Sequence, residues 1–359
     1  MNRNARLFSL MQGKVDAVLV ANGSEGVSDY NFRYFVNPSS GIFEHSFAVV
    51  TQKRTYVFTS ILERSALEGL PVTVYTYRDA KQLEKLLSSK LRGYKSIGIN
   101  RATLPVSYYN LIRKCFKGKL KDCSQALMEC RGVKDDEEIR RIAEACRIAS
   151  RVADMVPSML REGMTEKELA TLITKAMYDE GGEGNSFSPI VSFGKTSAIP
   201  HYFPGKVKLR KGHFVLTDFG CRYSNYCSDI TRTFIFGRAV ERQKELYETV
   251  LTAQTEAIKQ IGAGAVAGEV DAAARRVIDA RFKGRFIHSL GHGLGLQVHD
   301  GLPVLARGVD KKLEKNMVVT VEPGAYIPGF GGVRIEDDVV VTGNGVKVLT
   351  NAKKELIEV

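Results

Sequence analysis

Short runs of β-branched and aromatic residues alternate with amphipathic stretches over the first 125 or so positions. The runs predict strands at 15–20, 46–50, 54–59, 72–77 and 96–99. Between them, 61–69 and 79–93 have helical spacing of apolar residues and end at a glycine. These elements predict a small mixed α/β domain over residues 1–125, and no cluster of chemically reactive side chains stands out in it.

A change of pattern near residue 125 predicts a second domain over 126–359. An acidic run at 135–138 precedes apolar residues at helical spacing, which predicts a helix that Pro157 should kink or shorten. Thr165 and Glu168 form a capping box for the next helix, with Gly181 and Gly182 as its end. Further helices are expected at 241–262 and 269–282, and strands at 213–220, 228–237, 316–324 and 332–345.

Four acidic residues occupy these predicted apolar strands, although strand interiors disfavour carboxylates. They are Asp218, Asp229, Glu322 and Glu336. A carboxylate that faces a core must be paired or bound to metal, so together with His292 they predict a site for two hard divalent cations.

An alternative is that these acids are strand-end carboxylates paired with Arg232 and Arg334. In "RIEDD" the alternation of a strand places Glu336 and Asp338 on one face and Asp337 on the other. Spacing alone therefore accepts either Glu336 or Asp338 as a metal ligand.

The segment "HSLGHGLGLQVHD" (288–300) holds three of the six histidines. It lacks the glutamate that follows the first histidine in zinc-protease helices, and each of its three glycines would cost a helix roughly 1 kcal/mol. It also lacks the lysine and Ser/Thr of a phosphate-binding loop. The remaining interpretation is that the glycines allow the backbone of this segment to pass close to a metal site.

Composition narrows the class of protein. A chain of 359 residues with 44% hydrophobic content can bury two cores, and it contains no apolar run long enough for a transmembrane helix. The six scattered cysteines and the absence of a signal-peptide pattern indicate a soluble cytoplasmic protein with reduced thiols. The net charge of +12 comes from dispersed residues, so we expect a solvated basic surface and no nucleic-acid partner.

Several motifs in order along the chain resemble those of the pita-bread metallopeptidases that act on Xaa-Pro bonds, aminopeptidase P and prolidase. They are "TDFG", "YCSDITRTF", "HSLGHGLGLQVHD" and "VVTVEPGAYIPGFGGVRIEDDVVVT". In addition, "DYNFRYFVNPSSGIFEHSFAVVT" resembles the N-terminal domain that these enzymes share with creatinase. The resemblance implies a small mixed α/β N-terminal domain followed by a pita-bread catalytic domain.

The resemblance also implies a ligand set. Asp218 would chelate one metal ion, Asp229 and Glu336 would bridge both ions, and His292 and Glu322 would complete the second. This choice favours Glu336 over Asp338. Mn²⁺ or Co²⁺ is the usual occupant in the family.

The implied reaction is attack of a metal-bridging hydroxide on the Xaa-Pro carbonyl. Glu322 would shuttle the proton, while His201 and His299 would bind the carbonyl region and stabilise the oxyanion. His288 and Arg334 are further candidates for substrate binding. Phe187 and Tyr326 are candidate walls of the proline pocket.

One departure from the family pattern concerns substrate length. Prolidases usually carry an arginine after the second histidine that pairs with the carboxylate of the dipeptide, but Val304 stands at that position. An aminopeptidase acting on longer Xaa-Pro peptides is therefore as good an interpretation as a dipeptidase. A methionine-aminopeptidase-like enzyme and a non-enzymatic pita-bread binding module are further hypotheses. Relatives imply a homodimer with proline-containing peptides as substrates.

Overall fold

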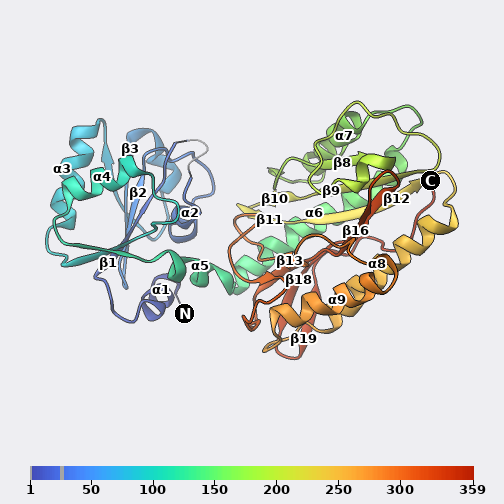
Figure 1. Cartoon of the computed structure of the whole chain (residues 1–359). Coiled ribbons are helices and arrows are strands. Elements are labelled where there is room, and N and C mark those ends of the chain that lie inside the picture. Colours follow the sequence, from blue (N-terminus) through green and yellow to red (C-terminus); the bar gives the residue numbers. More distant parts are fainter. Residues whose placement is uncertain (1, 25–27) are drawn as a thin grey trace. The chain divides into compact units, whose positions relative to one another are not determined.

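The computed structural model of the protein describes residues 2–24 and 28–359. The chain divides into two compact units, Met1–Arg131 and Gly132–Val359 (Figure 1). The division falls at the end of helix α5 (Ser124–Gly132), whereas the sequence pattern predicted a domain boundary near residue 125, in the first turn of this helix.

The first unit contains a six-stranded mixed sheet in the order β4-β3-β2-β1-β5-β6. Strand β1 is buried along its whole length, as expected for a central strand, and it pairs antiparallel with β2 and parallel with β5. The five strands predicted from the sequence are confirmed, and β6 was not predicted. The bounds are β1 Ala17–Ala21, β2 Phe47–Val50, β3 Thr55–Ser60, β4 Thr73–Tyr77, β5 Ser96–Ile99 and β6 Lys119–Asp122.

Four helices accompany this sheet: α1 (Arg3–Leu10), α2 (Tyr30–Val36), α3 (Ala80–Leu91) and α4 (Val106–Cys115). Helix α3 was predicted, but the helix predicted at 61–69 is wrong. That segment forms two 3-10 turns, Ile61–Glu63 and Ser65–Leu67. The side chain of Leu62 is 86% exposed and only that of Leu67 is buried, so the apolar face of the predicted helix has no surface to pack against.

The second unit contains four long helices, α6 (Asp136–Met159), α7 (Glu166–Asp179), α8 (Glu241–Lys259) and α9 (Ala267–Phe282). Capping boxes begin α6 at Asp135 and α7 at Thr165, the latter as predicted. Helix α6 continues for two residues beyond Pro157 and ends at Met159. No helix among the described residues is long and apolar enough to span a membrane.

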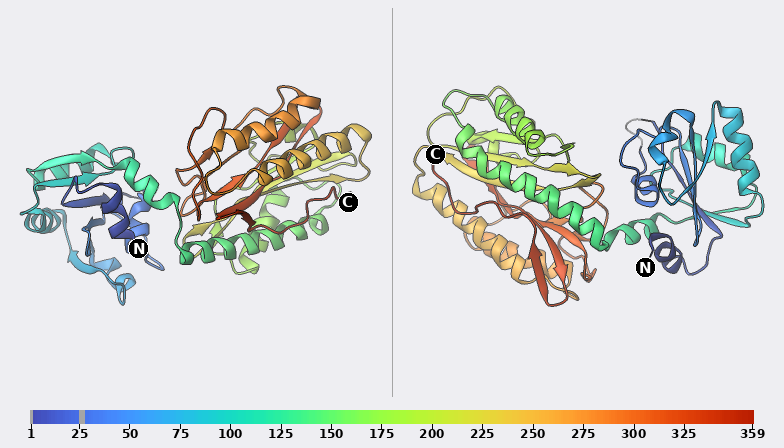
Figure 2. Two further views of the ribbon diagram at one scale, coloured as in Figure 1. Left: turned by 90° about the horizontal axis from the view of Figure 1, so that it is seen from below. Right: turned by 180° about the vertical axis from the view of Figure 1, so that it is seen from behind.

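The strands of the second unit lie between helix α6 on one side and helices α8 and α9 on the other (Figure 2). Antiparallel pairing gives the sheets β12-β9-β8, β15-β18-β19, β16-β17, β13-β14 and β11-β10-β7. The bounds are β7 Gly184–Asn185, β8 Ile190–Phe193, β9 His213–Phe219, β10 Cys221–Tyr223, β11 Tyr226–Cys227, β12 Ile230–Phe236, β13 Gly291–His292, β14 Val304–Leu305, β15 Val318–Val321, β16 Gly324–Ile327, β17 Gly331–Arg334, β18 Asp337–Thr342 and β19 Gly345–Val348.

Two hydrophobic cores hold these layers together. One core joins α8 and α9 to residues of β15 to β18, and the other joins α6 and α7 to β8, β9 and β12. Adjacent residues of β9 enter different cores, Phe214 the first and Val215 the second. The strands are therefore buried on both faces, and polar side chains within them require partners.

The strand predicted at 332–345 is broken in the structure. It forms β17 and β18, which belong to different sheets, with Ile335 and Glu336 between them. Asp229 precedes β12 and Glu322 directly follows β15, so of the four predicted strand carboxylates only Asp218 lies within a strand. The prediction that each of the four lies within a strand is therefore wrong for Asp229, Glu322 and Glu336, which lie just beyond strand ends.

A buried polar network underlies β18 and gives a first prediction. Asp337 is fully buried, and its carboxylate accepts hydrogen bonds from Arg232 Nη2 at 2.8 Å, Gln254 Nε2 at 2.7 Å and Lys354 Nζ at 2.8 Å. Although burial opposes it, the charges of Arg232 and Lys354 hold the pKa of Asp337 below its usual value. We expect Asp337→Ala to lower the free energy of unfolding by about 3–5 kcal/mol, because Arg232 is left buried and uncompensated.

Urea denaturation followed by circular dichroism measures this loss. Asp179→Ala is the control, because Asp179 forms an exposed ion pair with Lys175 on α7 and should contribute no more than about 0.5 kcal/mol. A loss at Asp337 no larger than that at Asp179 would contradict the structural role of the network.

Candidate active site

The ends of several strands and one glycine-rich segment bring the predicted acids and His292 together. Strand β9 carries Asp218, which lies opposite Thr231 of β12, two residues after Asp229. Thr231 Oγ1 donates to Glu336 Oε2 at 2.6 Å, and Glu336 N donates to Thr231 O at 3.1 Å. Glu336 is thereby fixed beside the two aspartates.

Glycines allow the strand that carries His292 to approach β15. A Cβ on Gly291 would lie 2.0 Å from the carbonyl oxygen of Thr320, and one on Gly293 would lie 2.6 Å from that of Leu302. Neither distance is possible for a side chain, so both positions require glycine. The approach also allows His292 N to donate to Thr320 Oγ1 at 3.1 Å. The glycines of "GHGLG" therefore serve close packing of the backbone around His292.

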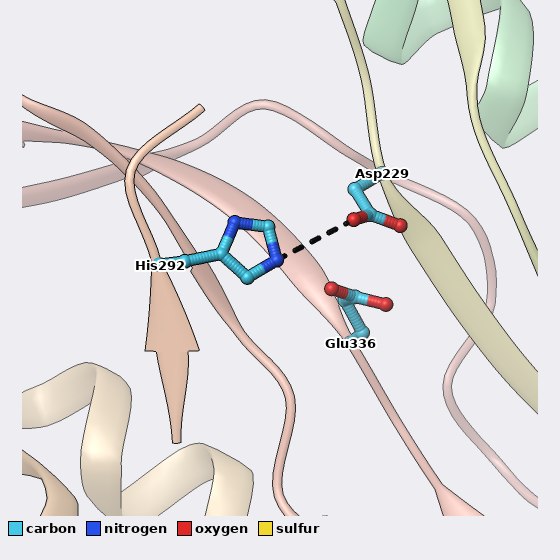
Figure 3. A group of neighbouring side chains, drawn as sticks. All are labelled: Asp229, His292 and Glu336. Carbon is cyan, nitrogen blue, oxygen red and sulfur yellow. Dashed lines mark ion pairs between the residues drawn. The ribbon is translucent and has the colours of Figure 1, made fainter. Parts of the chain in front are cut away.

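Figure 3 shows Asp229, His292 and Glu336 with their polar ends directed toward one another. Each offers one ligand atom, and these atoms lie within 4.8 Å of each other. His292 Nε2 is 3.7 Å from Asp229 Oδ2 and 3.4 Å from Glu322 Oε1. One histidine nitrogen and at least three carboxylates thus converge on a small volume.

Asp218 lies at the same site and contacts Arg334. Arg334 Nη2 donates to Asp218 Oδ2, and Arg334 Nη1 donates to Tyr326 Oη at 2.7 Å. Arg232, by contrast, pairs with Asp337 and with none of the four acids. The alternative of simple strand-end ion pairs therefore accounts for Asp218 only.

The "RIEDD" segment separates into three roles. Glu336 joins the converging group, and Asp337 belongs to the network with Arg232. Asp338 Oδ2 accepts from Asp229 N at 2.8 Å and from Cys146 Sγ at 3.2 Å. Asp338 thus fixes the backbone of Asp229 through its N–H group. The sequence did not predict this contact, because strand alternation gives only the face on which a side chain lies.

The donor set fits a divalent cation. Asp218 Oδ1 and Asp229 Oδ1 are buried and have no hydrogen-bond partner among the described residues, and such atoms are costly unless a cation binds them. Burial and the charges of Glu336 and Asp218 raise the pKa of Asp229, and burial raises that of Glu322 to about 8. Burial lowers the pKa of His292 to about 3, so its imidazole is neutral, as a ligand must be.

A pocket of about 510 Å³ opens onto this group. All nine site residues expected from the sequence line it. They are His201, Asp218, Asp229, His288, His292, His299, Glu322, Arg334 and Glu336. The sequence analysis missed other lining residues, including Ile190, Pro200, Ser289, Val298 and Gly301.

The histidines occupy different parts of the pocket. The rings of His292 and His299 have centroids 4.1 Å apart, and burial lowers the pKa of His299. His288 Nε2 lies 2.9 Å from Tyr326 Oη. Burial and the charge of Arg334 lower the pKa of His288 to about 4. Tyr326 therefore contacts His288 and is not among the residues that line the pocket, whereas Phe187, the other candidate wall residue, lines it.

Val304 also lines the pocket and lies opposite His292 in the β13–β14 pair. The only arginine or lysine among the described lining residues is Arg334. Its Nε donates to Thr231 Oγ1 at 3.1 Å, and its two Nη atoms contact Tyr326 and Asp218. The described lining residues therefore present no uncommitted guanidinium or ammonium group.

A mixed α/β unit followed by a carboxylate-lined pocket at strand ends is the architecture of the pita-bread metallopeptidases. The chain belongs to metallopeptidase family M24, which residues 140–343 match, and residues 3–133 match the creatinase/prolidase N-terminal domain. The expected family, fold class and hydrolase class are confirmed. Membership implies divalent metal ions, for which Asp229, His292 and Glu336 form a candidate group.

Relatives cover nearly the whole chain. An Xaa-Pro dipeptidase of Pyrococcus horikoshii is 33% identical over 348 residues, which are 96% of this chain and 95% of that protein. The structure of an Xaa-Pro dipeptidase from Bacillus anthracis superimposes with a TM-score of 0.91 at 34% identity and 99% coverage of both chains. An X-Pro aminopeptidase from Thermotoga maritima gives 0.90 at 32% identity and covers 100% of both chains.

Proposed function

We propose that the protein hydrolyses the bond between an N-terminal residue and proline, with two divalent cations held by Asp218, Asp229, His292, Glu322 and Glu336. The observation that carries the proposal is the convergence of these five side chains in one pocket, with buried carboxylate oxygens that lack partners among the described residues. Relatives named Xaa-Pro dipeptidase and X-Pro aminopeptidase support the substrate class.

Each ligand has a role in the proposal. Asp218 would chelate one cation, Asp229 and Glu336 would bridge both, and His292 and Glu322 would complete the second. Mn²⁺ and Co²⁺ suit a set of carboxylates with one imidazole. Divalent cations in such a site act as Lewis acids and activate water at neutral pH.

The remaining side chains bind and position the substrate. Glu322 accepts and returns the proton of the attacking water. His201 and His299 donate hydrogen bonds to the carbonyl region as negative charge develops there. His288 and Phe187 form part of the wall. Because the guanidinium of Arg334 is already bound to Asp218, Thr231 and Tyr326, it orients Asp218 rather than pairing with a substrate carboxylate.

The pocket favours peptides longer than a dipeptide. The free carboxylate of Xaa-Pro lies next to the proline ring and requires a cationic partner when it is taken from water. Val304 provides none, and Arg334 is committed to other groups. A peptide bond after proline is neutral and carries no such requirement.

Hydrolysis of Ala-Pro and Ala-Pro-Ala, each with Mn²⁺, tests this proposal. The wild-type protein should cleave Ala-Pro-Ala with the higher kcat/KM, and Val304→Arg should raise kcat/KM for Ala-Pro by about tenfold, the effect of roughly 1.4 kcal/mol from one charge-assisted pair. Val304→Leu is the matched control and should leave the ratio unchanged. Cleavage of Ala-Pro alone would indicate a dipeptidase, and failure on both peptides would contradict the proposed function.

The site predicts how pH governs stabilisation by metal. Since burial raises the pKa of Glu322 from 4.5 to about 8, the folded metal-free protein binds this proton more tightly than the unfolded chain. That contribution to stability is complete below about pH 4.5 and is lost as the pH rises through about 8. Cations bind the deprotonated ligands, so Mn²⁺ should raise the melting temperature more at about pH 8.5 than at about pH 6. Scanning fluorimetry measures both, and an equal shift at the two pH values would contradict the site.

Two further hypotheses make different predictions. A methionine-aminopeptidase-like enzyme would cleave Met-Ala-Ser but not Ala-Pro-Ala, although the match to the creatinase/prolidase N-terminal domain disfavours it. A binding module would be indifferent to Mn²⁺ and Co²⁺. We also expect a homodimer, which sedimentation velocity can test.

A further inference from the structure

Glu166 is a buried carboxylate that neither the metal site nor the pocket uses. It is the first residue of helix α7, and its side chain is fully buried. Acidic residues are common in the first turn of a helix, where they favour the helix dipole, but they are normally exposed. A carboxylate at this position without solvent must have dedicated donors.

Four donors surround the carboxylate of Glu166. Oε1 accepts from Phe193 N at 2.9 Å and from Thr196 Oγ1 at 2.6 Å. Oε2 accepts from Tyr202 Oη at 3.0 Å and from Gly205 N at 2.9 Å. These bonds occupy the whole accepting capacity of an ionised carboxylate.

All four donors belong to one segment, residues 193–205, which runs from the end of β8 through a 3-10 turn at Gly194–Ala198. Glu166 binds both ends of this segment. His201 lies between the 3-10 turn and the second pair of donors, Tyr202 and Gly205. Pro200 and His201 line the pocket. His201 is exposed at the surface, so its place depends on the path of this backbone.

We propose that Glu166 is a positioning residue that holds segment 193–205 so that His201 lies at the pocket. The inference rests on the proposed function of His201. The segment has a second anchor in β17, where Gly332 N donates to Ser197 Oγ at 2.8 Å. Glu166 supplies the anchor from helix α7.

The chemistry of the clamp requires a carboxylate. In Glu166→Gln one oxygen becomes an amide NH₂, which donates and cannot accept. The hydroxyls of Thr196 and Tyr202 can rotate, but the backbone N–H groups of Phe193 and Gly205 cannot. If the NH₂ takes the place of Oε2, it faces Gly205 N, which loses its acceptor. If it takes the place of Oε1, it faces Phe193 N, which keeps only its hydrogen bond to Thr196 Oγ1 at 2.9 Å, so either orientation loses one backbone contact of the clamp.

Hydrogen exchange of the metal-free protein tests the clamp without reference to activity. Glu166→Gln should accelerate exchange of the amides in 193–205 by about tenfold or more, the effect of roughly 1.4 kcal/mol. Glu168→Gln is the matched control, because Glu168 lies in the same turn of α7 and, among the described residues, its carboxylate accepts hydrogen bonds from Thr165 alone. Equal exchange in the two variants would overturn the inference.

A double-mutant cycle with His201→Ala tests whether the clamp acts through His201. With Ala-Pro-Ala and Mn²⁺, Glu166→Gln should lower kcat/KM by about 10- to 100-fold, but by less than about twofold when His201 is already alanine. Tyr202→Phe, which removes one donor and leaves the backbone N–H groups satisfied, should show a smaller effect with the same dependence on His201.

The same cycle separates the two proposals. Equal losses from Glu166→Gln in the presence and absence of the histidine would mean a general structural role and would overturn the inference. If the wild-type protein fails to cleave Ala-Pro-Ala, the proposed function fails, and exchange in 193–205 still decides whether Glu166 holds the segment.

Discussion

Asp229→Ala is expected to remove metal binding and hydrolysis together. Asp229 is buried, its Oδ1 has no hydrogen-bond partner among the described residues, and its Oδ2 lies 3.7 Å from His292 Nε2. Loss of a residue that only hydrogen-bonds a metal ligand typically lowers metal affinity or activity by about 10- to 100-fold. Loss of a proposed ligand should therefore lower kcat/KM by more than about 100-fold and lower the bound Mn²⁺ measured by mass spectrometry after dialysis.

The fold should survive this substitution. Burial and the neighbouring charges of Glu336 and Asp218 raise the pKa of Asp229, so the metal-free protein gains no stability from its charge. The melting temperature of metal-free Asp229→Ala should equal or exceed that of the metal-free wild type. Asp179→Ala, which removes an exposed aspartate far from the ligand set in sequence, is the control and should keep full activity. A variant that keeps its metal and its activity would refute the assigned site.

His201→Ala and His299→Ala are expected to lower kcat and leave the metal in place. Both histidines line the pocket beside the carboxylates without belonging to the converging group of three. If each stabilises the oxyanion, its removal should lower kcat by about 10²–10³-fold with a smaller change in KM. His292→Ala should instead lose metal, because its Nε2 lies among the carboxylates.

The control for the histidine variants is His45→Ala. His45 lies in the first unit, where its Nδ1 is 2.5 Å from Tyr108 Oη, and its replacement should leave kcat unchanged. Loss of bound Mn²⁺ in His201→Ala or His299→Ala would contradict the assignment of these residues to substrate.

The sequence predicted most long elements and nine of the residues that line the pocket. Helices α6 to α9 have apolar residues at helical spacing, and α6 and α7 begin with capping boxes. Strands such as β9 and β12 are rich in β-branched and aromatic residues. The four acids were detectable because carboxylates are rare in apolar strands. The resemblance to the pita-bread metallopeptidases then favoured Glu336 over Asp338, which strand spacing alone left equivalent.

The features that the sequence did not predict depend on tertiary contacts, which a single sequence does not display. The break between β17 and β18 occurs because the two strands join different sheets, and the run "VRIEDDVVV" shows no turn residue there. The predicted helix at 61–69 failed because its apolar face remains exposed. Glu166 resembles Glu168 in sequence, and only the course of residues 193–205 makes one buried and the other exposed.

We propose that five side chains of one pocket hold the cations that hydrolysis requires. Titration of the chelated protein with Mn²⁺, with bound metal and cleavage of Ala-Pro-Ala followed in the same samples, tests it most directly. We predict no cleavage before metal is added, and a rise that is complete when two ions are bound per chain. Cleavage by the fully chelated protein, or two bound ions in Asp229→Ala, would contradict the account.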